Sequence, residues 1–469
     1  MYLTKKFHIG ISFILFCILL SACGPSPEEL ATTSAAQTAA AVTDTPGSTS
    51  TPEPTIPPPT DTPIPTETNT PSPTYTPTIR PTFSPETLII PVNSPIRIAY
   101  LLWENNPVGI DSIRGIEIAI SEFGGAILGH PIELIGYDSE CQPFAAMRGS
   151  QILMQDETIL GVIGTSCSVA GLQAAPIISD NHRVMISPSN SSPELTASDT
   201  HAAGYFRTAP NDLVQIEAAA QYAFNELGVQ SLAIVRGATN PYQRLYSIAL
   251  CEVFTELGGE CVLDKAKDAG STYVAPIINS LVEANPDVVY FMGTDYQEGA
   301  AFLSEARKIT DLQDTALFFW ETYNHPEFLN LANEDVVGVY VTTTSWEIDR
   351  ETDIYQTFLI THTAEYGEDP VQIYHPYAYD ATTLLLMAIA QVAVPSDDGS
   401  LMVDPFAVQE ALYGKIEFQG LSGFIYCSEF GDCSNTSKGR VYQFTSGDPN
   451  TFQPGPADSV YSNPAQVWP

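Results

Sequence analysis

Residues 161–195 read GVIGTSCSVAGLQAAPIISDNHRVMISPSNSSPEL and contain two short apolar runs, each followed by a polar turn rich in serine. The first run, 159–165, has the length of a buried strand, and a helical pattern over 169–179 follows it. The second run, 184–186, leads into the turn 187–192. The pattern predicts strand, turn, helix, strand and turn, with serine hydroxyls at the ends of two successive strands.

These turns offer hydroxyl groups and unpaired backbone N–H groups together, and one of them opens a helix. Such a place suits a carboxylate, because the helix dipole favours an anion by roughly 0.3–1 kcal/mol. The alternative is that Ser166 and Ser168 only cap the helix.

On either side of this stretch, strands and helices alternate as in a parallel, doubly wound α/β sheet. A first series precedes residue 210 and a second follows it, so we expect two similar Rossmann-like lobes. Such sheets bind ligands at the carboxyl ends of their strands, which places a cleft between the lobes. The predicted strands of the two series are 96–102, 132–138, 159–165 and 184–186, then 231–236, 261–266, 288–292 and 317–320.

A third section begins near residue 336 and is too short for a domain of its own. It contains helical patterns at 353–366, 379–392 and 405–412, and it ends in a predicted hairpin of 421–427 with 440–445. We expect this section to complete both lobes.

The N-terminus has features of an exported chain. Lys5 and Lys6 precede an apolar run over 9–20, which is typical of a secretory signal. The run ends in Leu20-Ser21-Ala22-Cys23, which resembles the lipobox of bacterial lipoproteins and implies lipidation of Cys23. The alternative is an ordinary signal with an incidental cysteine. The Thr- and Pro-rich segment that follows favours an extended stalk, either O-glycosylated or a bare tether.

The charge and the cysteines narrow the function further. With 18 Lys and Arg against 55 Asp and Glu, the net charge is −37, which argues against nucleic acid as a partner.

Beyond Cys17 and Cys23, six cysteines remain, and an even number in an exported protein suggests disulfides. Cys141 and Cys167 follow neighbouring strands, and the other pairs are Cys251–Cys261 and Cys427–Cys433. Metal binding is the rival interpretation, but the spacings match no zinc motif.

Several short motifs, in this order and spacing, resemble the type I solute-binding proteins of ABC transporters, specifically the leucine/isoleucine/valine-binding kind. The resemblance covers nearly all of 96–445. The motifs are Gly115-Ile116-Glu117-Ile118-Ala119, Gly124 to Gly129, Tyr137-Asp138, Gly164 to Ser168, Ile186-Ser187-Pro188, Pro193-Glu194-Leu195 and Phe206-Arg207-Thr208.

This resemblance implies two α/β lobes joined by a hinge of three crossovers, which close on a ligand. It implies that Ser168 and the turn Ser189, Asn190 and Ser191 hold the ligand's α-carboxylate. The Cys141–Cys167 pair also matches a disulfide of that family.

For the ligand's ammonium group, the resemblance implies Asp212 and Glu321, and for the cleft wall Tyr242. Asp295 falls where the family often has an aromatic contact, with Tyr296 one residue later, which is a departure. Each has a structural alternative: Asp212 as a helix cap, Glu321 as a solvated loop acid and Tyr242 as a packing residue.

We therefore expect a signal peptide at 1–22, a lipidated N-terminus and stalk at 23–92, and lobe 1 from 93–210 plus 345–419. Lobe 2 is expected from 211–344 plus 420–446, with a C-terminal tail at 447–469.

The expected protein is a monomer without cofactor or metal, and it is anchored by lipid on the extracytoplasmic face of a membrane. It is expected to deliver an amino-acid-like solute to an ABC permease. The alternatives are a sensory receptor and a binder of amides, urea or carboxylates. An enzyme is not expected, because no nucleophile–base motif is present.

Overall fold

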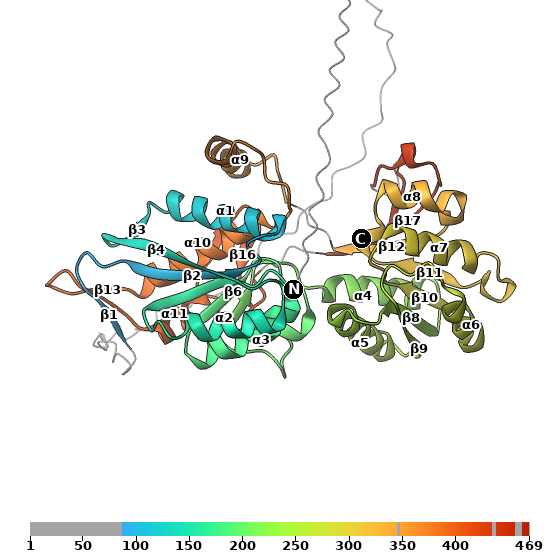
Figure 1. Cartoon of the computed structure of the whole chain (residues 1–469), viewed down its shortest axis with the longest axis horizontal. Coiled ribbons are helices and arrows are strands. Elements are labelled where there is room, and N and C mark those ends of the chain that lie inside the picture. The colour runs from blue at the N-terminus through green and yellow to red at the C-terminus, as the bar shows by residue number, and fades with distance from the viewer. Residues whose placement is uncertain (1–86, 345–347, 434–437, 455–461, 469) are drawn as a thin grey trace, which may run out of the picture. The chain divides into compact units, whose positions relative to one another are not determined.

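In the computed structural model the described residues are 87–344, 348–433, 438–454 and 462–468. The predicted signal, Cys23 and the stalk lie outside them, apart from the last residues of the 23–92 segment. The described part contains two large sheets with helices on both faces (Figure 1), which confirms the two-lobed α/β fold.

The first sheet belongs to lobe 1 and has six strands in the order β3-β4-β2-β5-β6-β7. All neighbours are parallel except β3 and β4. The sheet order reverses between β2 and β5, which is where such sheets bind ligands. The strands are β3 (Ala126–Ile127), β4 (His130–Asp138), β2 (Ile96–Leu102), β5 (Ile159–Gly164), β6 (Val184–Ser187) and β7 (Tyr205–Arg207).

Helices cover both faces of this sheet, with α1 on one side and α2 and α3 on the other (Figure 1). Strand β5 is buried at every residue, as an apolar run between two helical layers should be. The helices of lobe 1 are α1 (Pro107–Glu122), α2 (Pro143–Leu153), α3 (Ser168–Asp180), α9 (Asp353–Tyr366), α10 (His375–Val392) and α11 (Pro405–Leu412).

The second sheet belongs to lobe 2 and has the order β18-β17-β12-β11-β10-β8-β9. Strand β17 runs antiparallel to both of its neighbours, β12 and β18, and all other neighbouring strands are parallel. The strands are β8 (Ser231–Gly237), β9 (Glu260–Lys267), β10 (Val288–Phe291), β11 (Ala316–Phe319), β12 (Tyr340–Thr344), β17 (Gly439–Gln443) and β18 (Ala465–Trp468). Its helices are α4 (Leu213–Gln221), α5 (Pro241–Glu256), α6 (Ala275–Ala284), α7 (Tyr296–Ala306) and α8 (Pro326–Ala332).

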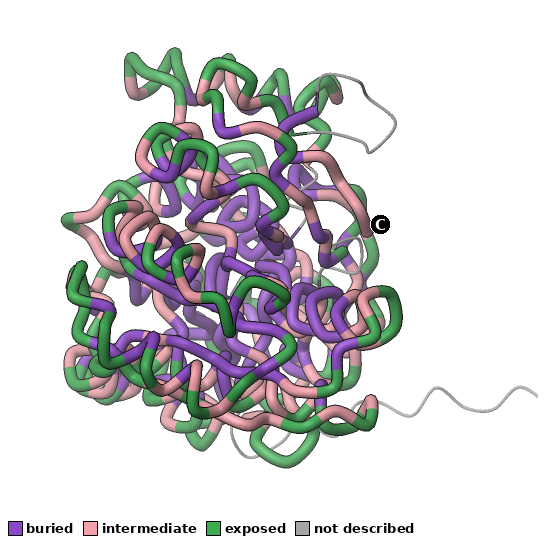
Figure 2. The backbone as a smooth tube through the Cα atoms, turned by 90° about the vertical axis from the view of Figure 1, so that its right-hand side faces the viewer, coloured by how far each residue is buried: buried purple, intermediate pink, exposed green. Residues whose placement is uncertain are grey.

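Short strands complete lobe 1: β1 (Leu88–Ile90), β13 (Val394–Pro395) and β14 (Leu401–Val403) form one small sheet, and β15 (Glu417–Gln419) and β16 (Phe424–Tyr426) form another. Buried residues follow the strands and the inner faces of the helices, while the outer helix faces are exposed (Figure 2).

The C-terminal section differs from its prediction. The expected hairpin of 421–427 with 440–445 is wrong, because β16 pairs with β15 and β17 pairs with β12. Ile425, Cys427 and Cys433 belong to the apolar core of lobe 1, so lobe 1 extends past residue 419. The expected tail is also wrong in part, because β18 adds a strand to lobe 2 and Trp468 packs against its core. These boundaries depend on the lobe in which each apolar side chain is buried. The local sequence pattern does not show which lobe that is.

The three expected cysteine pairs, Cys141–Cys167, Cys251–Cys261 and Cys427–Cys433, are disulfide-bonded. The first joins the loop after β4 to the residue that precedes α3. It therefore fixes the start of α3 at the carboxyl edge of the lobe 1 sheet.

Candidate functional site

All nine predicted site residues follow the carboxyl end of a strand, and five of them show how the fold gathers the site. Ser168 begins α3 after β5, and Ser191 lies in the turn after β6. Asp212 lies beyond β7, where the chain passes to lobe 2, and Tyr242 and Glu321 follow β8 and β11. In parallel sheets these ends share one edge, so the fold gathers residues that are far apart in the sequence.

Ser168 and the serine turn lie in direct contact. The Ser168 Oγ accepts hydrogen bonds from the backbone N–H groups of Ser191, at 3.1 Å, and Ser192, at 3.2 Å. Helix α3 has no side-chain cap, and the Ser166 Oγ accepts from the Trp103 N–H at 2.9 Å instead. The idea that these serines only cap the helix is therefore wrong. Ser168 keeps its hydroxyl hydrogen for another acceptor.

The polar groups of Ser189 and Asn190 form hydrogen bonds within the chain itself. The Ser189 hydroxyl donates to the Ser166 carbonyl at 3.0 Å, and the Asn190 amide donates to the Thr165 carbonyl at 2.8 Å. Both backbone N–H groups donate to the Ser187 Oγ, at 3.2 and 2.9 Å. The predicted clamp is thus reduced to Ser168 and Ser191, with the other two residues shaping the turn.

Arg207 supports this turn through hydrogen bonds to its backbone. Its side chain is completely buried, and its Nη1 donates to the carbonyls of Asn190, at 3.2 Å, and Ser192, at 2.7 Å. Its Nε forms a salt bridge with Asp432 at 2.5 Å. Gly171 in α3 permits the close approach of the turn, because an added Cβ would lie 2.3 Å from the Asn190 Oδ1.

Asp212, Tyr242 and Ser191 form a short hydrogen-bonded chain. The Tyr242 hydroxyl donates to the Asp212 carboxylate at 2.5 Å and lies 3.4 Å from the Ser191 Oγ. The Asp212 N–H donates to the Ser191 carbonyl at 2.9 Å. Asp212 does not cap α4 with its side chain, so the interpretation of a cap alone is wrong. Tyr242 also packs on Trp320, with ring centroids 6.2 Å apart.

Burial raises the pKa of both acidic residues. The Glu321 pKa rises to about 8, first because burial disfavours its charge and second because of the Asp212 charge. The Asp212 pKa also rises through burial, although hydrogen bonds from Tyr242 and Ser191 oppose this. Among the described residues neither carboxylate has a salt bridge. The acidic pair therefore has no salt-bridge partner there, although the positive charge of Arg207 also lowers the Asp212 pKa.

Asp295 and Tyr296 have other roles in the structure. The Asp295 Oδ1 accepts from the Glu298 N–H at 2.8 Å, and the two side chains form a capping box for α7. Tyr296 stacks on His325 with centroids 4.8 Å apart. The departure from the family pattern thus replaces an aromatic contact with a helix cap.

Sequence reasoning missed two residues that act on the acidic pair. The pKa of the Tyr374 phenol, just before α10 in lobe 1, is raised by burial and then by the charges of Glu321 and Asp212. Gln215, one helical turn after Asp212, lowers the Glu321 pKa, while its amide nitrogen donates to the Thr342 carbonyl at 3.0 Å and to the Thr342 Oγ1 at 3.1 Å. No local motif marks either residue, and only the tertiary fold brings them to the site.

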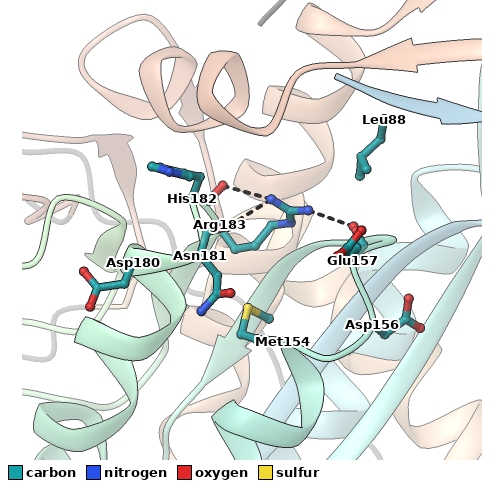
Figure 3. Close-up of a pocket in the computed structure, with 8 residues that line it drawn as sticks. All are labelled: Leu88, Met154, Asp156, Glu157, Asp180, Asn181, His182 and Arg183. Carbon is teal, nitrogen blue, oxygen red and sulfur yellow. Dashed lines mark hydrogen bonds between the residues drawn. The ribbon is translucent and has the colours of Figure 1, made fainter. Parts of the chain in front are cut away.

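A cavity of about 460 Å³ lies at the opposite edge of the lobe 1 sheet (Figure 3). It surrounds Arg183, just before β6, whose guanidinium donates to the carbonyls of Glu157 at 2.7 Å and Ile159 at 2.6 Å. This is the amino edge of the strands, and Arg183 caps exposed carbonyls there. Ligands of such sheets bind at the other edge, so we do not assign this cavity to the solute.

Within the part of the chain that the structure describes, no group of His, Cys, Asp or Glu side chains is arranged to hold a metal ion. None of its helices has the length and apolarity needed to cross a membrane.

Residues 104–448 match the profile of the family described as periplasmic binding protein. The Leu/Ile/Val-binding protein of Escherichia coli K12 is 28% identical over 255 residues, which cover 53% of this chain and 67% of that protein. A crystal structure of a leucine-binding protein from Thermotoga maritima is 24% identical, covers 75% of this chain and 96% of its own, and has a TM-score of 0.56.

A crystal structure of an ABC transporter solute-binding protein from R. palustris in complex with benzoate is also similar. It is 19% identical with a TM-score of 0.54 and covers 75% of this chain and 93% of its own. At these identities the two crystal structures establish the likeness of fold.

Proposed function

The chain belongs to the periplasmic binding protein family, whose members bind solutes and are not enzymes, and from this premise we propose that it is a solute-binding lipoprotein. We propose that it binds a small amino-acid-like ligand, branched-chain or related, outside the cytoplasm and delivers it to an ABC permease. The names of the E. coli and Thermotoga relatives support this ligand class.

The acidic pair is the observation that carries the proposal. Asp212 is buried and Glu321 is half-buried, and neither carboxylate forms a salt bridge among the described residues, so desolvation and mutual repulsion oppose their charges and make them costly. An ammonium group between Asp212 and Glu321 would remove that cost and fix the ligand's orientation. Tyr242, Trp320 and Tyr374 supply aromatic surface beside the charged group.

The carboxylate end of the ligand belongs at Ser168 and Ser191. The free hydroxyl hydrogen of Ser168, the Ser191 hydroxyl and the N-terminus of the 13-residue helix α3 all favour an anion there. The short chain from Ser191 through Tyr242 to Asp212 joins the two ends of this site. A zwitterion with adjacent charges satisfies both ends at once.

Closure of the two lobes provides the mechanism. Ser168 and Tyr374 come from lobe 1, whereas Tyr242 and Glu321 come from lobe 2, so neither lobe makes all the contacts. A ligand that contacts both lobes shifts the population toward the closed state by its differential affinity. A sensory receptor would use the same closure to signal to a membrane partner.

A carboxylate without an ammonium group is the second candidate ligand. The benzoate complex of the R. palustris relative favours it, and so does the departure at Asp295. Such a ligand would use Ser168 and Ser191 and leave the acidic pair protonated.

The test is isothermal titration calorimetry of the purified protein against the amino acids, small amides, urea and benzoate. We expect one zwitterionic amino acid to bind, and we expect Glu321→Gln to weaken it by about 100-fold, because a hydrogen bond to a charged group is lost. Glu305→Gln, on the exposed face of α7, is the matched control and should leave the affinity unchanged. Binding of benzoate alone, unaffected by Glu321→Gln, would favour the second candidate.

A further inference from the structure

A second cavity, of about 270 Å³, lies between residues 192–200 and helix α5. Residues 192–200 follow the serine turn and pack into the core of lobe 1, whereas α5 packs into the core of lobe 2. The volume is just below the range of about 300–1,000 Å³ that is usual for ligand pockets, so the cavity suits a small molecule. Its walls include Ser192, Glu194 and Asp199 from lobe 1 and Leu245, Ile248 and Glu252 from α5.

Two polar groups at this cavity are buried without a hydrogen-bond partner. Ser192 has no exposed surface, and its backbone N–H and carbonyl are bonded to Ser168, at 3.2 Å, and Arg207, at 2.7 Å. The Ser192 hydroxyl has no partner, and neither has the Glu194 Oε2. Only six buried side-chain atoms of the described residues lack a partner, and two of them belong to the walls of this one cavity. Because such atoms are costly, they indicate a place that is built to hold a ligand.

The charges of the walls are all negative. Glu194 and Asp199 line the cavity from lobe 1 and Glu252 lines it from lobe 2, and no lysine, arginine or histidine is among the described residues that line it. None of the three carboxylates forms a salt bridge with another described residue. Carboxylates that line a cavity with low-dielectric walls attract a cation.

The shape of the site favours an organic cation over a metal ion. The acidic side chains are not gathered closely enough to ligate a metal, since the described part of the chain holds no such cluster. Leu245 and Ile248, one turn apart on α5, add an apolar wall, and Ile248 is 41% exposed. A primary ammonium group has three donors, which match the two unpartnered oxygens of Glu194 and Ser192. An alkyl chain on that group would cover the apolar wall.

We propose that this cavity is a second binding site, for a small primary alkylammonium cation. The ammonium group donates to the Glu194 carboxylate and the Ser192 hydroxyl, and the alkyl chain lies on Leu245 and Ile248. Glu194 and Glu252 attract the cation from the two lobes, so the bound cation bridges them. It thereby stabilises the arrangement of the lobes in which both walls are present.

The experiment titrates the purified full-length protein with n-butylammonium chloride, observed by saturation-transfer NMR of the ligand. 1-Butanol is the neutral probe with the same alkyl chain. We expect butylammonium to bind with a dissociation constant of about 1 mM, and 1-butanol to bind at least about 10-fold more weakly, because it makes no charge-assisted hydrogen bond. Equal binding of the two probes, or no binding of butylammonium, would overturn the proposal.

Substitutions on both walls test where the cation binds. Glu194→Gln should weaken butylammonium binding by about 10- to 100-fold, since a hydrogen bond to a charged group is lost. Glu252→Gln should weaken it by about two- to fivefold, because water screens this exposed carboxylate. Glu256→Gln is the matched control, an exposed acid on α5 that does not line the cavity, and it should have no effect. Equal effects of Glu194→Gln and Glu256→Gln would assign the binding to general surface charge and overturn the site.

A second pair of variants keeps the test decisive if Glu194→Gln does not fold. Ile248→Lys places a tethered ammonium group at the partly exposed wall of the cavity, so it should abolish butylammonium binding. Ile248→Met keeps an apolar side chain there and should retain the binding. Wild-type affinity for butylammonium in Ile248→Lys would overturn the proposal.

The solute site also contains two carboxylates, so the probe must be assigned to one site. Glu321→Gln should change butylammonium affinity by less than about twofold, because Glu321 does not line this cavity. Loss of binding in Glu321→Gln but not in Glu194→Gln would place the cation at the acidic pair and overturn the second site. The second site does not rest on the proposed function, since butylammonium can bind here even if no amino acid binds the protein.

Discussion

The unusual charge state of Glu321 makes ligand binding depend on pH. Its pKa is raised to about 8 by burial and by the Asp212 charge, which favours the protonated carboxyl near neutral pH, whereas an ammonium ligand requires the carboxylate. Binding must therefore release a proton, and affinity should rise with pH up to about 8. Calorimetry in buffers of different ionisation enthalpy measures the proton release directly. Glu321→Gln should abolish it, and an affinity that is constant between about pH 6 and pH 8 would contradict this account.

The same group should affect the stability of the ligand-free protein. Its folded pKa lies above the unfolded value of about 4.3, so the folded state binds more protons between these two pH values. The free energy of unfolding should therefore fall as pH rises through this window. Urea denaturation at several pH values measures the slope, and Glu321→Gln should have a flatter profile than the wild type. An unchanged slope in that variant would assign the dependence to other groups.

At the scale of single elements, β7 supports the serine turn through Arg207. Replacing Arg207 with Met should leave the carbonyls of Asn190 and Ser192 and the Asp432 carboxylate without their donor. We expect a loss of roughly 3 kcal/mol in unfolding free energy, because two buried carbonyls and the partly buried Asp432 carboxylate lose their donor. Ligand affinity should fall as well, since the turn beside Ser168 is no longer fixed. Urea denaturation and calorimetry measure the two effects.

Arg97→Met is the matched control for that prediction. Arg97 also bonds two acidic residues, Glu133 and Asp156, but its side chain is 36% exposed. Surface ion pairs contribute about 0–1 kcal/mol, so the control should be nearly neutral. Equal losses in the two variants would show that Arg207 acts through general charge rather than through the turn.

At the scale of the whole molecule, the proposed mechanism requires the lobes to move. Phe144 follows β4 in lobe 1 and Tyr273 follows β9 in lobe 2, and their side chains are 80% and 73% exposed. Dyes on Phe144→Cys and Tyr273→Cys should show increased energy transfer when ligand is added. Dyes on Tyr273→Cys and Glu327→Cys, both in lobe 2, should show no change. Equal responses of the two pairs would contradict closure.

The anchor is a second prediction for the whole molecule. If Cys23 is lipidated, the wild-type protein should fractionate with membranes, and mass spectrometry should find a lipid on the residue. Cys23→Ser should release the protein into the soluble exported fraction without changing ligand affinity. Membrane association that persists in Cys23→Ser would remove the lipid anchor from the proposal.

The sequence by itself determined the repeating strand–helix pattern, the two lobes and the serines at the ends of β5 and β6. It could do so because hydrophobic periodicity and turn residues are local signals. It also pointed to Ser168, Asp212, Tyr242 and Glu321, through their positions after predicted strands and through family resemblance.

Only the tertiary structure decided which of these residues meet and what each polar atom does. It showed that Ser189 and Asn190 shape the serine turn and that Asp295 caps α7. It also brought Tyr374 and Gln215 near the acidic pair and assigned 420–433 and β18 to their lobes. Hydrogen-bond partners and buried faces depend on residues distant in the chain, and no local pattern encodes them. The pKa of Glu321 follows from the same cause, because burial by distant elements creates it.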